Sequence, residues 1–175
     1  MGGTAVSSEL IKKLPKLKII ANYGVGYDAV DVKQATLSNV KVTNTPDVLN
    51  DEVADTAIAL TLCVYKNIAL ANQFLLEKKW LKSEYPLSKK FSGTKFGILG
   101  MGRIGKTIAK RIESFNCEIC YHSRNQKDVK YKYFSKLEDL AEYVDTLCVI
   151  TPGGEETKHL VLSLIHISEP TRRLV

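Results

Sequence analysis

The sequence lacks any long uninterrupted hydrophobic run. Its longest apolar stretch, residues 56–65, is broken by threonines and ends at Lys66. A membrane-spanning helix needs about 20 predominantly apolar residues, so we expect no membrane partner. The first residues also lack the basic and apolar segments of a secretory leader, and Val6 stands where a myristoylation signal requires serine or threonine. We therefore expect neither a leader nor a lipid anchor.

Cysteine is sparse, with four residues at positions 63, 117, 120 and 148. Cys117 and Cys120 have the spacing of redox and zinc motifs, but they fall in a segment that we predict to be a buried strand. Residues three apart on a strand point to opposite faces of the sheet, too far apart for a disulfide or a shared metal ion. We expect four buried free thiols, no metal site and a reducing, cytoplasmic location.

Lysine and arginine outnumber the acidic residues by 25 to 19, which gives a formal net charge of +6. The lysines are scattered, and no stretch interleaves them with aromatic residues as nucleic-acid-binding segments do. We therefore expect no nucleic-acid partner. The positive charge is equally consistent with attraction of small anionic molecules.

Hydrophobic periodicity predicts strands that alternate with helices along the chain. The expected strands are residues 17–21, 40–43, 95–99, 117–121 and 146–150. The expected helices are residues 7–14 with a serine cap, residues 30–37, one long helix from 51 to about 78 with Asn50 as N-cap, a helix ending at Phe115, and one capped by Ser135. This alternation predicts an α/β fold of the Rossmann type, a doubly wound parallel sheet with helices on both faces.

A glycine-rich turn, residues 100–105 (GMGRIG), follows a predicted strand and opens a predicted helix. This is the context that a dinucleotide-binding turn requires. Gly100 makes the tight turn, Gly102 lets a pyrophosphate approach the backbone, and Gly105 lets the helix pack close to the strand. The N-terminus of the helix supplies amide groups to the phosphates.

The residues at the end of the next strand indicate whether the cofactor is NAD(H) or NADP(H). An NAD site usually places an acidic residue there, about 20 residues after the first glycine, to bind the ribose 2′-hydroxyl. This chain has Ser123 and Arg124 instead, and the next acidic residue is Asp128. Serine and arginine can bind a 2′-phosphate, which a carboxylate would repel. We predict NADP(H) as the preferred cofactor, with NAD(H) as the second option if Arg124 is an ordinary surface arginine.

Three motifs together resemble the D-isomer-specific 2-hydroxyacid dehydrogenase family. They are residues 17–28 (LKIIANYGVGYD), residues 42–55 (VTNTPDVLNDEVAD) and residues 97–105 (GILGMGRIG). The resemblance is greatest to the glyoxylate/hydroxypyruvate reductase branch, which shares the serine and arginine after the second strand. It covers residues 4–161.

The resemblance implies a site for each part of a ternary complex. Backbone amides of Val25 and Gly26 would bind the substrate carboxylate. Arg103 and Ile104 would lie along the pyrophosphate of the cofactor, and Thr151 and Pro152 beside the ribose on its nicotinamide side. Val53 would form an apolar wall for the nicotinamide. The long helix would form a homodimer.

The resemblance also implies a division of the chain. Residues 1–46 correspond to the C-terminal part of a flavodoxin-like substrate domain, and residues 47–161 to the NAD(P)-binding domain. The family's catalytic arginine, glutamate and histidine correspond to positions after Val161, so we expect this chain by itself to be inactive. Residues 162–172 match, codon by codon, the translation of a transposase adapter used in sequencing libraries, and we interpret residues 162–175 as a non-native tail.

The predicted function is reduction of small 2-oxo acids, such as glyoxylate or hydroxypyruvate, to D-2-hydroxy acids. A phosphoglycerate dehydrogenase-like branch is an alternative, and so is a non-enzymatic, dinucleotide-sensing corepressor of the same fold. An acidic residue at the end of the second strand would favour either alternative. The sequence has none there.

Overall fold

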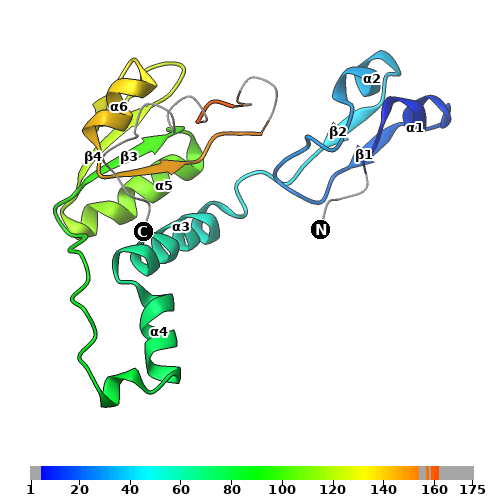
Figure 1. Ribbon diagram of the computed structural model, residues 1–175. Coiled ribbons are helices and arrows are strands. Elements are labelled where there is room, and N and C mark those ends of the chain that lie inside the picture. Colours follow the sequence, from blue (N-terminus) through cyan, green and yellow to red (C-terminus); the bar gives the residue numbers. More distant parts are fainter. Residues whose placement is uncertain (1–4, 154–156, 158, 162–175) are drawn as a thin grey trace. The chain divides into compact units, whose positions relative to one another are not determined.

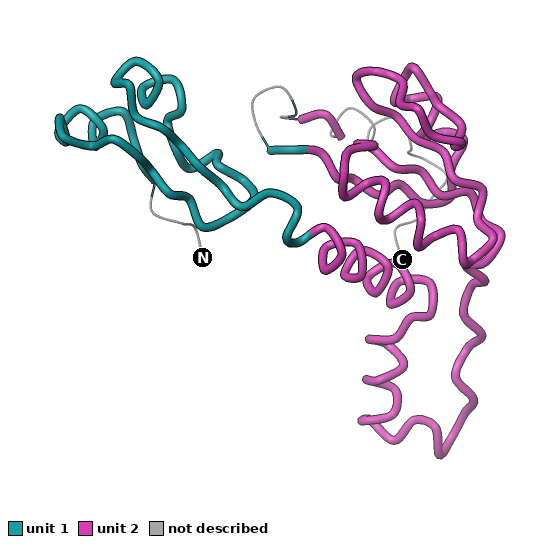
Figure 2. The backbone as a smooth tube through the Cα atoms, turned by 180° about the vertical axis from the view of Figure 1, so that it is seen from behind, with its two compact units in different colours: residues 1–49, 152–158 teal, residues 50–151, 159–175 magenta. Residues whose placement is uncertain are grey.

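The computed structural model describes residues 5–153, 157 and 159–161, and it divides into two compact units. Residues 1–49 and 152–158 form the first unit, and residues 50–151 and 159–175 form the second (Figure 2). The predicted tail at residues 162–175 lies outside the described residues.

The first unit contains a parallel two-stranded sheet. Strands β1 (Ile19–Ala21) and β2 (Lys41–Thr43) pair in register, with helices α1 (Ser8–Lys12) and α2 (Val32–Leu37) beside them. The hydroxyl of Ser7 caps α1, as the sequence predicts, and the carboxylate of Asp31 caps α2. Three buried residues hold the unit together: Ile11, Ala35 and Val40.

The second unit contains a parallel four-stranded sheet in the order β5-β4-β3-β6. The strands are β3 (Lys95–Leu99), β4 (Glu118–His122), β5 (Lys132–Tyr133) and β6 (Thr146–Val149). Three of these strands agree with the predicted ones. The two-residue strand β5 was not predicted, because so short a segment shows no periodicity.

Helices cover both faces of this sheet, as predicted (Figure 1). Helices α3 (Asn50–Tyr65) and α5 (Arg103–Ile112) pack on one face, where Phe96 and Ile98 of the central strand are buried. The short helix η2 (Glu113–Phe115) continues from α5. Helix α6 (Leu137–Tyr143) packs on the other face against Leu99. Alternate residues of β3 therefore serve two separate cores.

The prediction of one long helix over residues 51–78 is wrong. The structure has α3, then α4 (Ile68–Leu76) and the short helix η1 (Lys79–Leu81), with α3 and α4 bent by 58° at the break. Asn67 adopts a left-handed conformation (φ 51°), which asparagine tolerates better than most residues. Among the described residues no single helix is long and apolar enough to cross a membrane, although the bent pair together has that length and composition.

Two smaller predictions also need correction. Ser135 does not cap α6: the N-cap position is Lys136, and no side chain caps the helix. Of the four cysteines predicted to be buried only Cys120 is, since Cys63 is exposed on α3 and Cys117 and Cys148 are half-buried. Cys117 and Cys120 do contribute to the cores on opposite faces of the sheet, as the strand geometry predicts.

Candidate functional site

The glycine-rich turn connects β3 to α5, and packing within the protein requires two of its glycines. Gly100 has φ +109°, and a Cβ at this position would lie 2.6 Å from the carbonyl oxygen of Ile150. A Cβ on Gly105 would lie 2.2 Å from the carbonyl oxygen of Gly100. Neither position can hold a larger residue without movement of the backbone.

Gly102 differs from both, because no contact among the described residues requires glycine there. Its φ of −84° suits any residue, and a Cβ would meet no heavy atom of the described residues within 4 Å. Gly102 is the N-cap of α5, yet no side chain caps this helix. The open space and the uncapped amides together form a cradle for an anion at the positive end of the helix dipole. Arg103 is exposed and Ile104 half-buried in the turn that follows.

The end of β4 lies directly beside this turn. The N–H of Gly100 donates to the carbonyl oxygen of His122 (2.9 Å), so Ser123 and Arg124 follow at the same edge of the sheet. The hydroxyl of Ser123 donates to the carbonyl oxygen of Asn125 (2.7 Å), which leaves its oxygen able to accept another bond. Arg124 is exposed. The predicted role of Ser123 and Arg124 at a ribose 2′-substituent stays a prediction.

The end of β6 reaches the same turn from the other side. The N–H of Ile150 donates to the carbonyl oxygen of Leu99 (2.9 Å), and the methyl group of Thr151 is 3.4 Å from where a Cβ on Gly100 would lie. The structure thus brings Thr151 to the glycine-rich turn. Pro152 belongs to the first unit.

Val53 lies half-buried in the first part of α3, next to Ala54, which is buried in the core with α5. Its predicted role as an apolar wall for the cofactor stays a prediction.

The predicted carboxylate-binding loop lies in the first unit, directly after β1. Val25 is half-buried and Gly26 is exposed. Within the described part of the chain, neither backbone N–H of these two residues donates a hydrogen bond, whereas the N–H of Gly24 donates to Asn22 (3.1 Å). Two neighbouring unpaired amides are a suitable binding site for a carboxylate.

The model of the D-isomer specific 2-hydroxyacid dehydrogenase NAD-binding domain matches residues 58–163. The chain belongs to this family. The match contains the glycine-rich turn and the ends of β4 and β6.

Similar proteins include several reductases of this family. A glyoxylate/hydroxypyruvate reductase A from Arabidopsis thaliana is 44% identical over 155 residues, which are 88% of this chain and 50% of the relative. A glyoxylate reductase from Pyrococcus horikoshii is 39% identical over 166 residues, covering 89% of this chain and 50% of the relative. The chain therefore spans about half the length of the curated relatives it matches.

A solved structure of a related reductase has a similar backbone fold. The NADPH-dependent glyoxylate/hydroxypyruvate reductase from Sinorhizobium meliloti, in complex with NADP and malonate, superimposes with a TM-score of 0.84 at 43% identity. The match covers 90% of this chain and 50% of that one. The α/β fold with parallel sheets is thus the fold of 2-hydroxyacid dehydrogenases.

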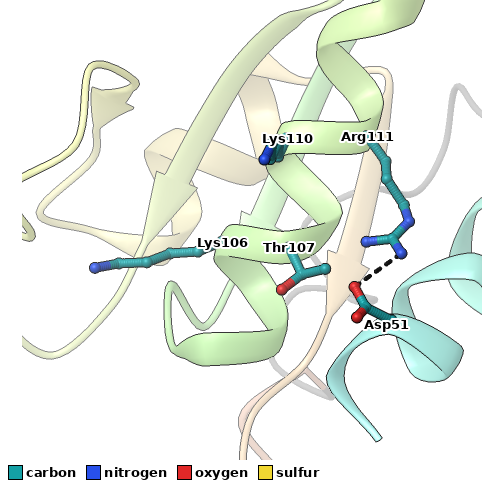
Figure 3. A pocket seen from close by; sticks show the side chains of 5 residues that line it. All are labelled: Asp51, Lys106, Thr107, Lys110 and Arg111. Atoms are coloured by element: carbon teal, nitrogen blue, oxygen red, sulfur yellow. Dashed lines mark hydrogen bonds and ion pairs between the residues drawn. The ribbon is translucent and has the colours of Figure 1, made fainter. Parts of the chain in front are cut away.

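A depression of about 540 Å³ lies beside helices α3 and α5 (Figure 3). The guanidinium of Arg111 forms ion pairs with Asp51 (3.0 Å) and with Asp55, one helical turn apart on α3. Hydrogen bonding to Asp51 raises the pKa of Arg111 above its usual range. No local sequence pattern predicts this contact, which joins α3 to α5.

Proposed function

We propose that the complete protein carrying this sequence is an NADPH-dependent reductase of small 2-oxo acids of the glyoxylate and hydroxypyruvate type, producing D-2-hydroxy acids. The observation that carries the proposal is the end of β4, where Ser123 and Arg124 follow the strand beside the glycine-rich turn and the sequence has no acidic residue between the strand and Asp128. The similar reductases from Arabidopsis thaliana and Sinorhizobium meliloti support the choice of substrate and cofactor.

The second unit has the groups that a dinucleotide requires. In this proposal it is a Rossmann-type domain, in which the pyrophosphate lies over Gly102 and accepts hydrogen bonds from the first amides of α5. Arg124 and Ser123 bind the 2′-phosphate, and Thr151 lies near the nicotinamide ribose. When bound, NADPH supplies the hydride that reduces the keto carbon.

The first unit has a group suited to the other reactant. In this proposal it is part of a flavodoxin-like substrate domain, and the amides of Val25 and Gly26 bind the substrate carboxylate. The reductase from Sinorhizobium meliloti was crystallised with malonate, itself a carboxylate. By the family resemblance, the residues that polarise the carbonyl and supply the proton correspond to positions after Val161.

A second copy of the chain is the proposed partner of α3 and α4. Large apolar side chains are exposed along these helices and η1: Leu60, Val64, Leu70, Leu75, Leu76, Trp80 and Leu81. Many large apolar side chains exposed on neighbouring helices are typical of an interface. We propose that it forms a homodimer.

The test is oxidation of NADPH by the complete protein, followed by absorbance, with glyoxylate and hydroxypyruvate as substrates and NADH as the alternative cofactor. We expect turnover of both acids, a preference for NADPH, and the D isomer where the product is chiral. The 175-residue chain serves as the control and should be inactive. Turnover with NADH but not with NADPH, or no turnover of either acid, would contradict the proposal.

A further inference from the structure

Two asparagines occupy equivalent positions in the first unit. Strands β1 and β2 pair with Ala21 opposite Thr43, and Asn22 and Asn44 are the next residue on each strand. Their side chains therefore leave from neighbouring points at the same end of the sheet. Both side chains are partly buried and both reach into the loop that carries Val25 and Gly26.

The asparagine amides bind the carbonyl oxygens of this loop. The Nδ2 group of Asn22 donates to Gly24 (3.2 Å) and to Gly26 (2.8 Å), and that of Asn44 donates to Val25 (2.9 Å). The N–H of Thr45 also donates to Gly24 (3.0 Å). Three consecutive carbonyl oxygens thus have partners inside the unit, whereas the N–H groups of Val25 and Gly26 have none among the described residues.

Peptide geometry connects these two observations. In a planar trans peptide the C=O and the following N–H point in opposite directions. A bond to the oxygen of Gly24 therefore turns the N–H of Val25 away from the donors Asn22 and Thr45, and a bond from Asn44 to the oxygen of Val25 turns the N–H of Gly26 away from Asn44. Asn44 is the described partner of the oxygen of Val25, so it determines the direction of the Gly26 N–H.

We propose that Asn22 and Asn44 are positioning residues that orient the Val25 and Gly26 amides toward a carboxylate before it binds. The proposal rests on the proposed function for the identity of the substrate. Donors oriented in advance do not need to reorganise when the anion arrives, which improves affinity without any contact between the asparagines and the substrate.

The experiment measures binding of oxalate, a non-reacting dicarboxylate, to the complete NADPH-loaded protein by titration calorimetry. We expect Asn44→Ala to weaken oxalate binding and to raise the KM for glyoxylate, each about five- to tenfold, as expected for one lost orienting hydrogen bond. We expect a smaller change in kcat and no change in NADPH affinity. Asn22→Ala should act in the same direction, but less on the Val25 amide, because Thr45 also holds the oxygen of Gly24.

Asn44→Asp tests the role of the donor, since it keeps the shape but presents an ionised acceptor to the carbonyl of Val25. It should weaken oxalate binding at least as much as the alanine variant at pH 7. Relative to the unmodified protein, it should recover as the pH is lowered and the carboxyl regains a proton to donate. Asn44→Ala should show no such recovery.

Asn39→Ala is the matched control in the same unit, because Asn39 is exposed, has φ 55° and lies outside the loop. It should reduce thermal stability without changing oxalate binding. The proposal is overturned if the Asn44 variants bind oxalate like the unmodified protein, if they behave like Asn39→Ala, or if neither variant folds. If the unmodified protein turns over no 2-oxo acid but Asn44→Ala still weakens oxalate binding, the proposed function fails and the positioning role stands.

Discussion

Gly105 lies so close to Gly100 that a single methyl group on it would come within 2.2 Å of the Gly100 carbonyl oxygen. This contact joins the first turn of α5 to the end of β3 and leaves no room for a side chain between them. Gly102 lies between the same two residues in the sequence, yet an added methyl group there meets no atom within 4 Å in the part of the chain that the structure describes. The three glycines of one motif therefore have different physical roles.

Replacing these glycines should separate stability from cofactor binding. Gly105→Ala should destabilise the complete protein by about 2–4 kcal/mol, because backbone must move to accept the methyl group. Gly102→Ala should leave stability within about 1 kcal/mol but weaken NADPH binding by about tenfold or more, since the methyl group occupies the pyrophosphate's space. Thermal melting and fluorescence titration measure the two effects. A loss of stability in Gly102→Ala without a loss of affinity would contradict this assignment.

Arg124→Ala should raise the Kd for NADPH roughly ten- to a hundredfold, about 1.5–3 kcal/mol, and leave that for NADH nearly unchanged. The reason is that only NADPH carries the 2′-phosphate that a guanidinium can bind. The difference should shrink with added salt, because the arginine is exposed. Ser123→Asp should lower NADPH affinity further by repulsion. An equal loss for both cofactors would instead indicate a contact common to both, such as the pyrophosphate.

Arg111→Ala should lower the melting temperature of the protein, because its guanidinium binds two carboxylates of α3 at once and is itself largely covered. Lys110→Ala is the matched control on the same helix: Lys110 is exposed and forms no ion pair within 4 Å in the described part of the chain. Its effect should be clearly smaller. Equal effects of the two substitutions would show that the ion pairs with Asp51 and Asp55 do not stabilise the protein.

Ionisation of Tyr131 should lower the free energy of unfolding of the protein in alkaline solution. Burial, together with a hydrogen bond to Glu113 (2.8 Å), raises the pKa of Tyr131 from 10.0 to about 12. The unfolded chain loses this proton first, so the stabilisation is complete below pH 10 and is lost as the pH rises toward 12. Chemical denaturation of Tyr131→Phe should show a shallower decline over that range. Tyr23→Phe, at a fully exposed tyrosine, should decline like the unmodified protein.

Cys63 should report the proposed dimer. It is exposed on α3 near Leu60 and Val64, whereas burial raises the pKa of Cys120 and of Cys148 and slows their reaction. In dilute solution we expect one fast phase in the reaction of the protein with a thiol reagent, and this phase should be absent in Cys63→Ser. Its rate should fall as the protein concentration increases. A Cys63 rate that does not depend on concentration, with a monomer in sedimentation, would contradict the dimer.

The sequence alone was sufficient for the features that depend on neighbouring residues. The strand that ends at Leu99, the turn with Gly100 and Gly105, and the cap at Ser7 all follow from short-range periodicity and backbone sterics. The family can also be identified from the sequence, because its motifs are short segments that follow one another in a fixed order. Residues 58–163 match its NAD-binding domain.

Only the tertiary structure decided the features that depend on distant partners. The break at Asn67 interrupts an apolar pattern that continues on both sides, and Tyr65 before it is held by Phe91 (ring centroids 4.9 Å apart) and by Thr146 (2.8 Å). Asn44 reaches a loop 19 residues away, and a sequence shows neither the strand register nor the side-chain direction that brings them together. Adjacent residues determine whether a segment prefers a helix, a strand or a turn, whereas a hydrogen bond between distant segments forms only when the chain has folded.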